Sequence, residues 1–596
     1  MFIFFLSLVL LAAAASAQRT QVTVANGTIE GLTCVRSDVV SFLSIPYAAS
    51  PQRFSVPKPY DAKYNGSGLL IAKTGAPSCP QFSGAGGQED CLFLDVYAPA
   101  NATDSSKLPV KVWIYGGSNE GGSISQPTYT GCLAAVDSLM VSINYRVGPL
   151  GFLALPEANL TGNYGTLDQL TALRWVQDNI AAFGGDPARV MVFGQSAGAL
   201  DTFVLSTLPQ ATTLMSAAAM ESGGGRNIPN ISEVVDWNRK FAAAVGCTPS
   251  DVACLRGLPL ATLHSAGVTV ELAVDGASAP PTANTLLQNA GKGATWGPVV
   301  DGTIVPRQPA EAGVQVPSIL GSNTQDGSLF VVDQYGPHAL QLGSDSYEQF
   351  LTSNFGALAD SIEKTFPLAS FESSIPADLQ ALNATTAYFA MVSIMSHVRY
   401  TCPARRALIS AASRGIKAYG YLFDHTPSCA WFPGMSDTEI LGPTHTAEIP
   451  FVLGLTRNLP PPSGHCNLTT AEDDIASFML GAWTRMAATR QPTTDKDSSR
   501  WPAWNEGIGT GLLVGAGQVS TGYINYSSCD FWDQVEASIV RLDASGNLTA
   551  TASASAASSS PTTKKKSAGC HAAAAWPAHY SVITAIFSII TAGFFL

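Results

Sequence analysis

The sequence predicts an α/β fold, in which one large, mostly parallel sheet carries helices on both faces. The first observation is that apolar runs of strand length alternate with segments of helical periodicity, the pattern of consecutive strand–helix–strand units. The second is that neither a repeat of about 20 to 50 residues nor an internal linker divides the chain. A single large domain over residues 18–545 is therefore the simplest organisation.

The expected strands and helix follow one another along the chain. After the β-like runs QVTVANGTIEGLTCV and VVSFLSIPYA, the expected strands cover 92–99, 110–117, 139–147 and 189–193. In DQLTALRWVQDNIAAFGGD, a helical face is formed by Leu170, Leu173, Trp175, Val176 and Ile180. Gly184-Gly185 is expected to end this helix. Later apolar runs cover 296–306, 316–323 and 417–425.

Both ends of the chain have the composition of processing signals. Residues 1–17 are apolar and end in Ala15-Ser16-Ala17, which predicts a secretory signal peptide cut after Ala17. A mature membrane anchor is the alternative, but the run is short for spanning. Residues 546–567 form a Ser/Thr/Ala-rich stalk. Residues 568–596 combine small residues, a spacer and an apolar tail, which predicts a GPI-attachment propeptide, with a tail-anchored helix as the alternative. The expected attachment residue is Ser567 or Gly569.

If the chain is secreted, we expect N-linked glycans and a location outside the cell. Its Asn-x-Ser/Thr sequences make nine candidate glycosylation sites: Asn26, Asn65, Asn101, Asn159, Asn230, Asn383, Asn467, Asn525 and Asn547. With a signal peptide and a GPI anchor, the protein is expected at the cell surface or cell wall. The net charge of −12 and the lack of basic clusters outside Lys564–Lys566 argue against a nucleic-acid partner.

The cysteines favour disulfides over metal binding. The chain has 11 cysteines, and cleavage before Cys570 would leave an even number. No Cys-x-x-Cys pair or Cys/His cluster has the spacing of a zinc site, so we expect no metal and no cofactor.

Chemistry is concentrated at Gly194-Gln195-Ser196-Ala197-Gly198. This G-x-S-x-G sequence follows an expected strand and precedes a helical pattern, the context in which a strained turn lifts a nucleophilic serine to the sheet edge. The flanking glycines relieve crowding in such a turn, and the helix N-terminus favours negative charge. The alternative is a Gly/Ser-rich turn without chemistry. A catalytic serine also needs a base and an acid. The chain has eight histidines, and position alone does not select the base.

From about residue 21 to 535 the chain resembles the type-B carboxylesterase/lipase family, which includes cholinesterases and fungal lipases, and within it a secreted, fungal-type member. The resemblance rests on EDCLFLDVYAP (89–99), VWIYGG (112–117), NYGTLDQLTALRWVQDNIAAFGGDPARVMVFGQSAG (163–198), WGPVVDG (296–302) and GPTHTAEIPFVLG (442–454). It implies the α/β-hydrolase fold and hydrolysis of small-molecule carboxylic esters.

The resemblance also implies a triad. Ser196 is the nucleophile, Asp326 in GSNTQDG is the acid, and His445 in GPTHTAE is the base. His425 is expected to be a structural histidine, and Glu448 a nearby structural carboxylate. Asp326 could instead be a turn-forming Asp before a glycine.

The same resemblance implies which residues lie next to the triad and which supply the oxyanion donors. Ser222 matches a second serine near the triad, and Gln195 replaces a common Glu. The implied oxyanion donors are the N–H groups of Gly117, Ser118 and Ala197. The family's Gly-Gly-Gly-Phe run is here Gly116-Gly117-Ser118-Asn119, followed by Glu120, which puts full activity in doubt. We expect this change to favour smaller or more polar acyl groups.

The resemblance implies three disulfides, and their loops bear on function. The pairs are Cys79–Cys91, Cys247–Cys254 and Cys402–Cys529, which leaves the pairing of Cys34, Cys132, Cys429 and Cys466 open. Only 11 residues without a Trp separate Cys79 from Cys91, so neither a long lipase-type lid nor a choline-binding Trp is expected there. A general serine carboxylesterase is therefore the favoured interpretation. A catalytically weak binding or adhesion homologue and a triacylglycerol lipase are the alternatives.

Overall fold

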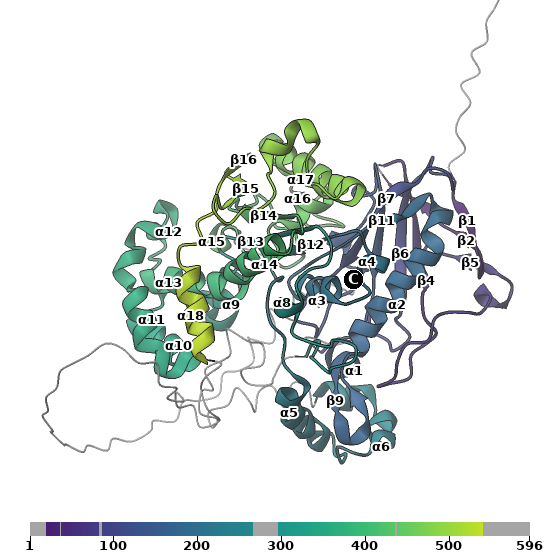
Figure 1. Ribbon diagram of the computed structural model, residues 1–596, viewed down its shortest axis with the longest axis horizontal. Helices are drawn as coiled ribbons and strands as arrows, with labels where there is room; N and C mark the ends of the chain where they lie inside the picture. Colours follow the sequence, from purple (N-terminus) through teal and green to yellow (C-terminus); the bar gives the residue numbers. More distant parts are fainter. Residues whose placement is uncertain (1–18, 36, 83–85, 266–295, 436–437, 540–596) are drawn as a thin grey trace, which may run out of the picture.

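The computed structural model describes residues 19–35, 37–82, 86–265, 296–435 and 438–539 (Figure 1). The expected signal peptide, the stalk, Asn547 and the candidate attachment residues Ser567 and Gly569 lie outside these residues.

The architecture of the described residues confirms the α/β prediction. One 11-stranded sheet runs in the spatial order β16-β15-β14-β13-β12-β11-β7-β8-β6-β4-β3, and its seven central strands, from β15 to β8, are parallel. In that order the strands are β16 (Gln518–Tyr523), β15 (Thr510–Gly515), β14 (Ala418–Phe423), β13 (Ser318–Asn323), β12 (Ala217–Glu221), β11 (Gly185–Gln195), β7 (Leu108–Ile114), β8 (Leu139–Ile143), β6 (Phe93–Pro99), β4 (Val39–Pro46) and β3 (Leu32–Thr33). Smaller sheets are formed by β1 (Gln21–Val24), β2 (Gly27–Glu30) and β5 (Leu69–Ile71), and by β9 (Ala154–Leu155) and β10 (Leu160–Thr161).

Helices cover the sheet from both sides. Helix α17 packs on β7, β11 and β12 from one side, and α3 packs on the same strands from the other (Figure 1). The helices are α1 (Gly148–Phe152), α2 (Tyr164–Asn179), α3 (Ala197–Thr207), α4 (Ala211–Leu214), α5 (Ile231–Ala244), α6 (Val252–Gly257), α8 (Pro309–Ala312), α9 (Ser328–Tyr335), α10 (Ser344–Phe355), α11 (Ala359–Thr365), α12 (Ala377–Ala381), α13 (Thr386–Ser396), α14 (Cys402–Ser413), α15 (Thr438–Leu441), α16 (Ile449–Leu453), α17 (Thr470–Thr489) and α18 (Cys529–Ile539). Because both faces are covered, the central strands read as continuous apolar runs.

Two expected elements differ from the structure. The run 110–117 leaves the sheet after Ile114, so Gly116 and Gly117 belong to a loop at the sheet edge. The run 296–306 forms no strand beyond one bridge between Asn230 and Val300. Its chain turns instead, because one carboxylate oxygen of Asp301 accepts the N–H groups of residues 303, 304 and 305.

Five disulfides tie the described residues together, and they include the three pairs that the family resemblance implies. The pairs are Cys34–Cys132, Cys79–Cys91, Cys247–Cys254, Cys402–Cys529 and Cys429–Cys466. The last pair closes a loop around the segment that contains His445.

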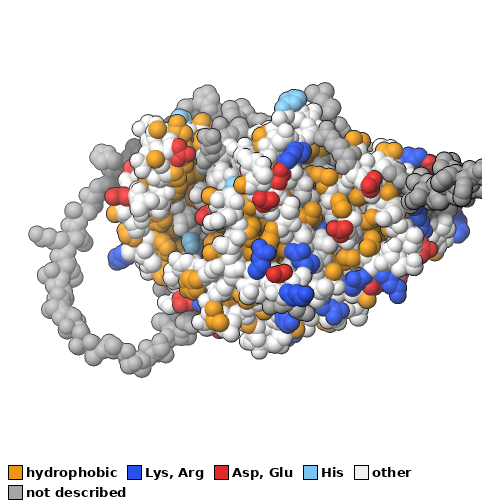
Figure 2. Space-filling view, turned by 90° about the horizontal axis from the view of Figure 1, so that it is seen from above, with side chains coloured by type: hydrophobic (Ala, Val, Ile, Leu, Met, Phe, Trp, Pro, Cys, Tyr) orange, Lys and Arg blue, Asp and Glu red, His pale blue; other side chains and the backbone are white. Residues whose placement is uncertain are grey.

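The surface carries most of the candidate glycosylation asparagines. Seven of the eight that the structure describes are exposed, and Asn26 is half-buried, so the described sites are accessible to modification. On the face shown in Figure 2, basic side chains lie in small groups among acidic and apolar ones and form no continuous basic patch. Within the described residues, no helix combines the length and apolar character needed to cross a bilayer.

Candidate active site

Four neighbouring parallel strands deliver the candidate residues to one edge of the sheet. Strand β7 ends just before Gly116, β11 just before Ser196, β12 just before Ser222, and β13 three residues before Asp326. Carboxyl ends of parallel strands meet at the same edge, which is where open α/β sheets bind ligands. The topology thus assembles the site from segments far apart in sequence.

The turn at Ser196 is strained and can be built only with small neighbours. Ser196 has φ 59° and ψ −123°, a backbone conformation that L-residues rarely adopt. A Cβ at Gly194 would lie 2.5 Å from the Ile114 carbonyl oxygen, and one at Gly198 would lie 2.1 Å from the same atom. Those glycines therefore let β11 turn into α3 while staying packed against β7, as a nucleophile elbow requires.

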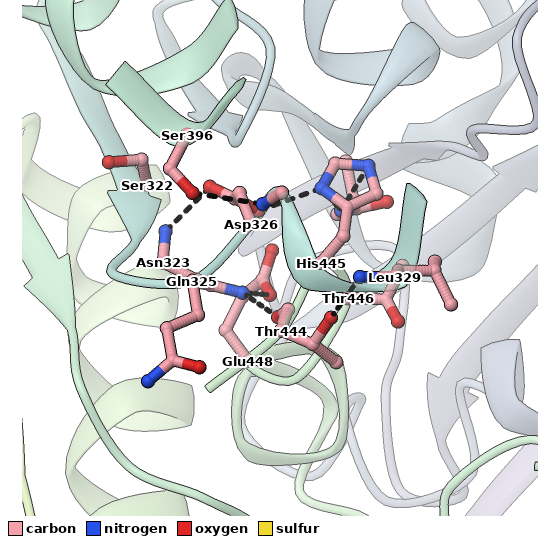
Figure 3. A network of polar contacts seen from close by, with 12 residues as sticks. Ser322, Asn323, Gln325, Asp326, Leu329, Ser396, Thr444, His445, Thr446 and Glu448 are labelled. Atoms are coloured by element: carbon pink, nitrogen blue, oxygen red, sulfur yellow. Dashed lines mark hydrogen bonds and ion pairs between the residues drawn. The ribbon is translucent and has the colours of Figure 1, made fainter. Parts of the chain in front are cut away.

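His445 and Asp326 form a buried hydrogen-bonded pair (Figure 3). His445 Nδ1 lies 2.7 Å from Asp326 Oδ1, and Asp326 Oδ2 accepts the N–H of Asn323 at 2.8 Å. Both side chains are buried. A carboxylate in this position fixes the tautomer of the imidazole and leaves Nε2 as the atom that can accept a proton.

Hydrogen bonds join the two loops that carry this pair. The Asn323 amide donates to the Thr444 carbonyl at 2.7 Å, and the Leu329 N–H donates to the Thr444 hydroxyl at 3.1 Å (Figure 3). The two donors lie on either side of Asp326 in sequence, and both acceptors belong to Thr444 next to His445, so these contacts hold the imidazole against its carboxylate.

Ser196 lines the same cavity as His445, although no hydrogen bond joins the two side chains among the described residues. The Gln195 amide nitrogen instead lies 3.3 Å and 3.4 Å from the two ring nitrogens of His445. Catalytic hydrogen bonds are often loose without substrate and tighten in the reacting complex.

Beneath the pair lies a group of buried acids. Burial, together with the neighbouring Asp326 carboxylate, raises the pKa of Glu448 to about 8. Burial, together with Glu448, raises the pKa of Glu221 well above its ordinary value. The Asn323 amide donates to Glu448 at 2.6 Å, whereas the buried Ser222 hydroxyl has no partner among the described residues. Glu448 therefore supports the loop that holds the acid Asp326 and makes no contact of its own with the His445 ring nitrogens.

The three residues predicted as oxyanion donors have N–H groups that are unused within the described part of the chain. No described residue accepts a hydrogen bond from the N–H of Gly117, Ser118 or Ala197. Ser118 and Asn119 have φ 57° and 59°, so both non-glycine residues adopt the left-handed conformation that a glycine would adopt freely. The turn is thus formed, at a conformational cost, and it keeps the backbone donors in the loop beside Ser196.

Two cavities meet at Ser196. The first is largely apolar and is lined by His445 together with Tyr129, Phe330, Phe432 and Met435. The second is lined by Asn119, Arg226, Trp296, Arg399 and Tyr400. Phe330, Ser118 and Ser196 border both.

His425 lines neither of the two cavities at Ser196. Its Nε2 is 3.0 Å from Glu472, and the same carboxylate caps the first turn of α17. The described residues contain no group of three or more His, Cys, Asp or Glu side chains arranged to hold a metal ion.

The sequence pattern did not indicate Arg226 or Arg399 as site residues. Arg226 comes four residues after Ser222, and Arg399 lies in a π-helical turn, His397–Thr401, between α13 and α14. The only local signal for Arg226 is a charged residue after the glycine run 223–225, and nothing in sequence places Arg399 beside it.

Comparisons with known proteins agree with this geometry. The sequence profile of the carboxylesterase family matches residues 18–532. A fumonisin B1 esterase of Sphingopyxis macrogoltabida is 30% identical over 525 residues, which cover 83% of this chain and 86% of that protein. A para-nitrobenzyl esterase of Bacillus subtilis is 29% identical, covering 81% and 92%. A bile salt-activated lipase of Bos taurus is 29% identical, covering 81% of each chain.

A solved carboxylesterase structure is similar to this chain in fold and sequence. A carboxylesterase of Geobacillus stearothermophilus, crystallised at pH 6.2, has a TM-score of 0.68 and 28% identity. The match covers 86% of this chain and 100% of that one. The narrower prediction of a fungal-type member stays a prediction.

Proposed function

Because the chain belongs to the carboxylesterase family, and is therefore a carboxylic ester hydrolase with the α/β-hydrolase fold, we propose that it acts through a Ser196–His445–Asp326 triad and an acyl-enzyme. His445 Nε2 takes the proton of the Ser196 hydroxyl as the oxygen attacks the ester carbonyl. The N–H groups of Gly117, Ser118 and Ala197 stabilise the negative oxygen of the tetrahedral intermediate.

The remaining steps return the enzyme to its starting state. His445 gives its proton to the leaving alkoxide, so the alcohol departs and the acid half stays bound to Ser196. Water then attacks the acyl-enzyme while His445 accepts its proton, and the free acid is released as Ser196 regains a proton. One water is consumed for each ester cleaved.

The observation that carries the proposal is the 2.7 Å contact between His445 Nδ1 and Asp326 Oδ1, at a cavity that Ser196 also lines. Such a pair leaves a correctly oriented base facing the space above a strained serine. Asp serves as the triad acid here because the hydrogen bond forms with the shorter side chain.

A general carboxylesterase fits better than an interfacial lipase. The disulfide Cys79–Cys91 closes a loop too short for a long lid, and the cavity beside His445 is lined largely by apolar side chains. The lipase alternative is retained because one relative is named as a bile salt-activated lipase. The non-catalytic alternative is favoured only by the left-handed Ser118 and Asn119.

We also propose that the protein is secreted, glycosylated and held at the cell surface by a GPI anchor. Five disulfides are typical of an oxidising compartment, and exposed Asn-x-Ser/Thr sites support glycosylation. Treatment of expressing cells with phosphatidylinositol-specific phospholipase C should release the protein, whereas a tail-anchored helix would leave it on the membrane.

The catalytic proposal is tested by hydrolysis of p-nitrophenyl esters from acetate to palmitate, with Ser196→Ala as the control. We expect saturable hydrolysis that disappears in the variant, with a preference for short and medium acyl chains. A maximum at palmitate would favour the lipase. A folded, glycosylated protein that hydrolyses none of the series would favour the binding homologue.

A further inference from the structure

The second cavity beside Ser196 has the chemistry of an anion site. Its lining contains two arginines, Arg226 and Arg399, and its described lining residues include no Asp or Glu.

Arg226 lines the cavity and has no ion-pair partner within the part of the chain that the structure describes. Its side chain is 92% buried, and its Nε atom has no hydrogen-bond partner among the described residues. Its guanidinium lies 5.9 Å from the centre of the Tyr400 ring. A buried, unpaired donor is costly unless a ligand satisfies it, so this side chain is suited to binding an anion.

Arg399 brings a second cation to the same ring. Its guanidinium lies 5.9 Å from the centre of Tyr400 and 5.3 Å from that of Phe330. It sits in the π-helical turn His397–Thr401, a distortion frequent at functional sites. The two arginines therefore stand around one aromatic ring in the cavity wall.

The buried acid Asp201 acts on Arg226 without forming an ion pair with it among the described residues. Asp201 interacts electrostatically with Arg226, but its oxygens accept hydrogen bonds from the amides of Asn119 at 3.2 Å and Gln169 at 2.6 Å. Burial lowers the pKa of Arg226 to about 10, with Arg399 adding to the effect, so Arg226 remains protonated at neutral pH. Arg226 therefore brings a protonated guanidinium to the cavity wall.

The position of His445 decides which half of an ester enters this cavity. His445 must reach the leaving alcohol oxygen to protonate it, and His445 lines the apolar cavity but not the cationic one. The alcohol half therefore lies on the apolar side. The acyl half, on the other side of the Ser196 oxygen, extends toward Arg226.

We propose that the acyl half of the preferred substrate carries a carboxylate, so that the substrate is a hemiester of a dicarboxylic acid with an apolar alcohol. This inference rests on the proposed triad, and it names the substrate class of that same site. Water adds across the ester bond, the apolar alcohol leaves with the proton from His445, and the dicarboxylate is released. The planar guanidinium of Arg226 matches a carboxylate better than an ammonium would.

The test compares monobenzyl glutarate with benzyl hexanoate, two esters with the same alcohol and acyl chains of similar length. For the wild-type enzyme we expect kcat/KM to favour the glutarate hemiester by about 10- to 100-fold, the range of one charge-assisted hydrogen bond. Arg226→Gln should lower this preference by about the same factor. Arg226→Lys should keep part of it, and Arg399→Gln should also lower it.

Arg457→Gln is the matched control, because Arg457 is an exposed arginine paired with Asp473 and lines neither cavity. Its preference should equal that of the wild type. If Arg226→Gln fails to fold, Arg226→Lys and Arg399→Gln still decide the question. A wild-type preference near one, or a preference unchanged in the folded arginine variants, would overturn the inference while leaving the esterase intact. Loss of hydrolysis of both esters by the wild type, together with the p-nitrophenyl series, would mean that the proposed function itself has failed.

Discussion

Two cavities meet at Ser196, and their lining residues differ in polarity and charge. The cavity that His445 lines is largely apolar, with Tyr129, Phe432 and Met435 in its wall, whereas the other carries Arg226 and Arg399. His445 lines the apolar cavity and does not line the cationic one.

This difference divides the site into two tasks. In the proposed mechanism, residues on the His445 side handle the proton, and an apolar wall there suits an alcohol that gains one. In the same proposal, residues on the arginine side touch the acyl group that stays on the enzyme, so they can set specificity without entering the proton transfers. The predictions below probe each side with a change that should leave the other side intact.

The largest effect is expected at Asp326. Asp326→Asn should lower kcat for ester hydrolysis about 10⁴-fold, because His445 loses the carboxylate that fixes its tautomer. Asp201→Asn is the matched control, since it removes a buried carboxylate beside the cationic cavity. That variant should change kcat less than about tenfold. Similar losses in the two variants would mean that Asp326 has no special role.

The next effect is expected at Gly117. Its φ of 114° and a Cβ only 2.6 Å from the Gly121 carbonyl oxygen mean that Gly117→Ala must displace the loop that carries the oxyanion donors. We expect kcat to fall about 10²-fold, the effect of losing one donor. Gly68→Ala is the control, because Gly68 also has positive φ but open space around it. An unchanged kcat in Gly117→Ala would place the oxyanion donors elsewhere.

Two phenylalanines distinguish the cavities directly. Phe330 borders both, so Phe330→Ala should join them and reduce the preference for an anionic acyl group by about tenfold. Phe432 lines only the apolar cavity, so Phe432→Ala should weaken binding of large apolar alcohols by about tenfold without changing that preference. Steady-state kinetics on matched ester pairs would show the two patterns. Identical patterns would contradict the separation of the cavities.

The smallest effect concerns stability and pH. Because the folded-state pKa of Glu448 is about 8, its burial favours the protonated form. The stability that this form provides is present in acid and is lost as the pH rises from about 4.5 through about 8. Glu448→Gln should flatten this decline in the free energy of unfolding, measured by denaturant titration at several pH values. The exposed Glu372→Gln should leave the curve unchanged, and an equally steep decline in Glu448→Gln would contradict the assignment.

The sequence predicted those features of the molecule that depend on contiguous residues. The strand, the turn and the helix around Ser196 are contiguous, and their glycines are visible in the motif. Asp326 and His445 lie 130 and 249 residues beyond Ser196. Family resemblance, and not local pattern, selected them, and the 2.7 Å contact between them is a property of the folded chain.

What the sequence did not reveal depends on segments that meet only in three dimensions. Arg226 follows β12, Arg399 lies in the turn between α13 and α14, and each reads alone as an ordinary surface charge. The prediction of smaller or more polar acyl groups rested on the altered run 118–120. Within it, Asn119 lines the cavity of both arginines, although its amide donates to Asp201. For the run 296–306 the sequence predicted a strand that does not form. Its apolar residues indicated a strand, whereas the Asp301 carboxylate organises a turn there.

The most direct test of the account is covalent labelling with an organophosphate, followed by peptide mapping. The account predicts one label per chain, on the peptide that contains Ser196, with none in Ser196→Ala or in protein pre-incubated with excess substrate. The second serine near the triad provides the internal control, because Ser222→Ala should still be labelled. A folded protein that takes no label, or takes it on another residue, would contradict the assignment of Ser196 as the nucleophile.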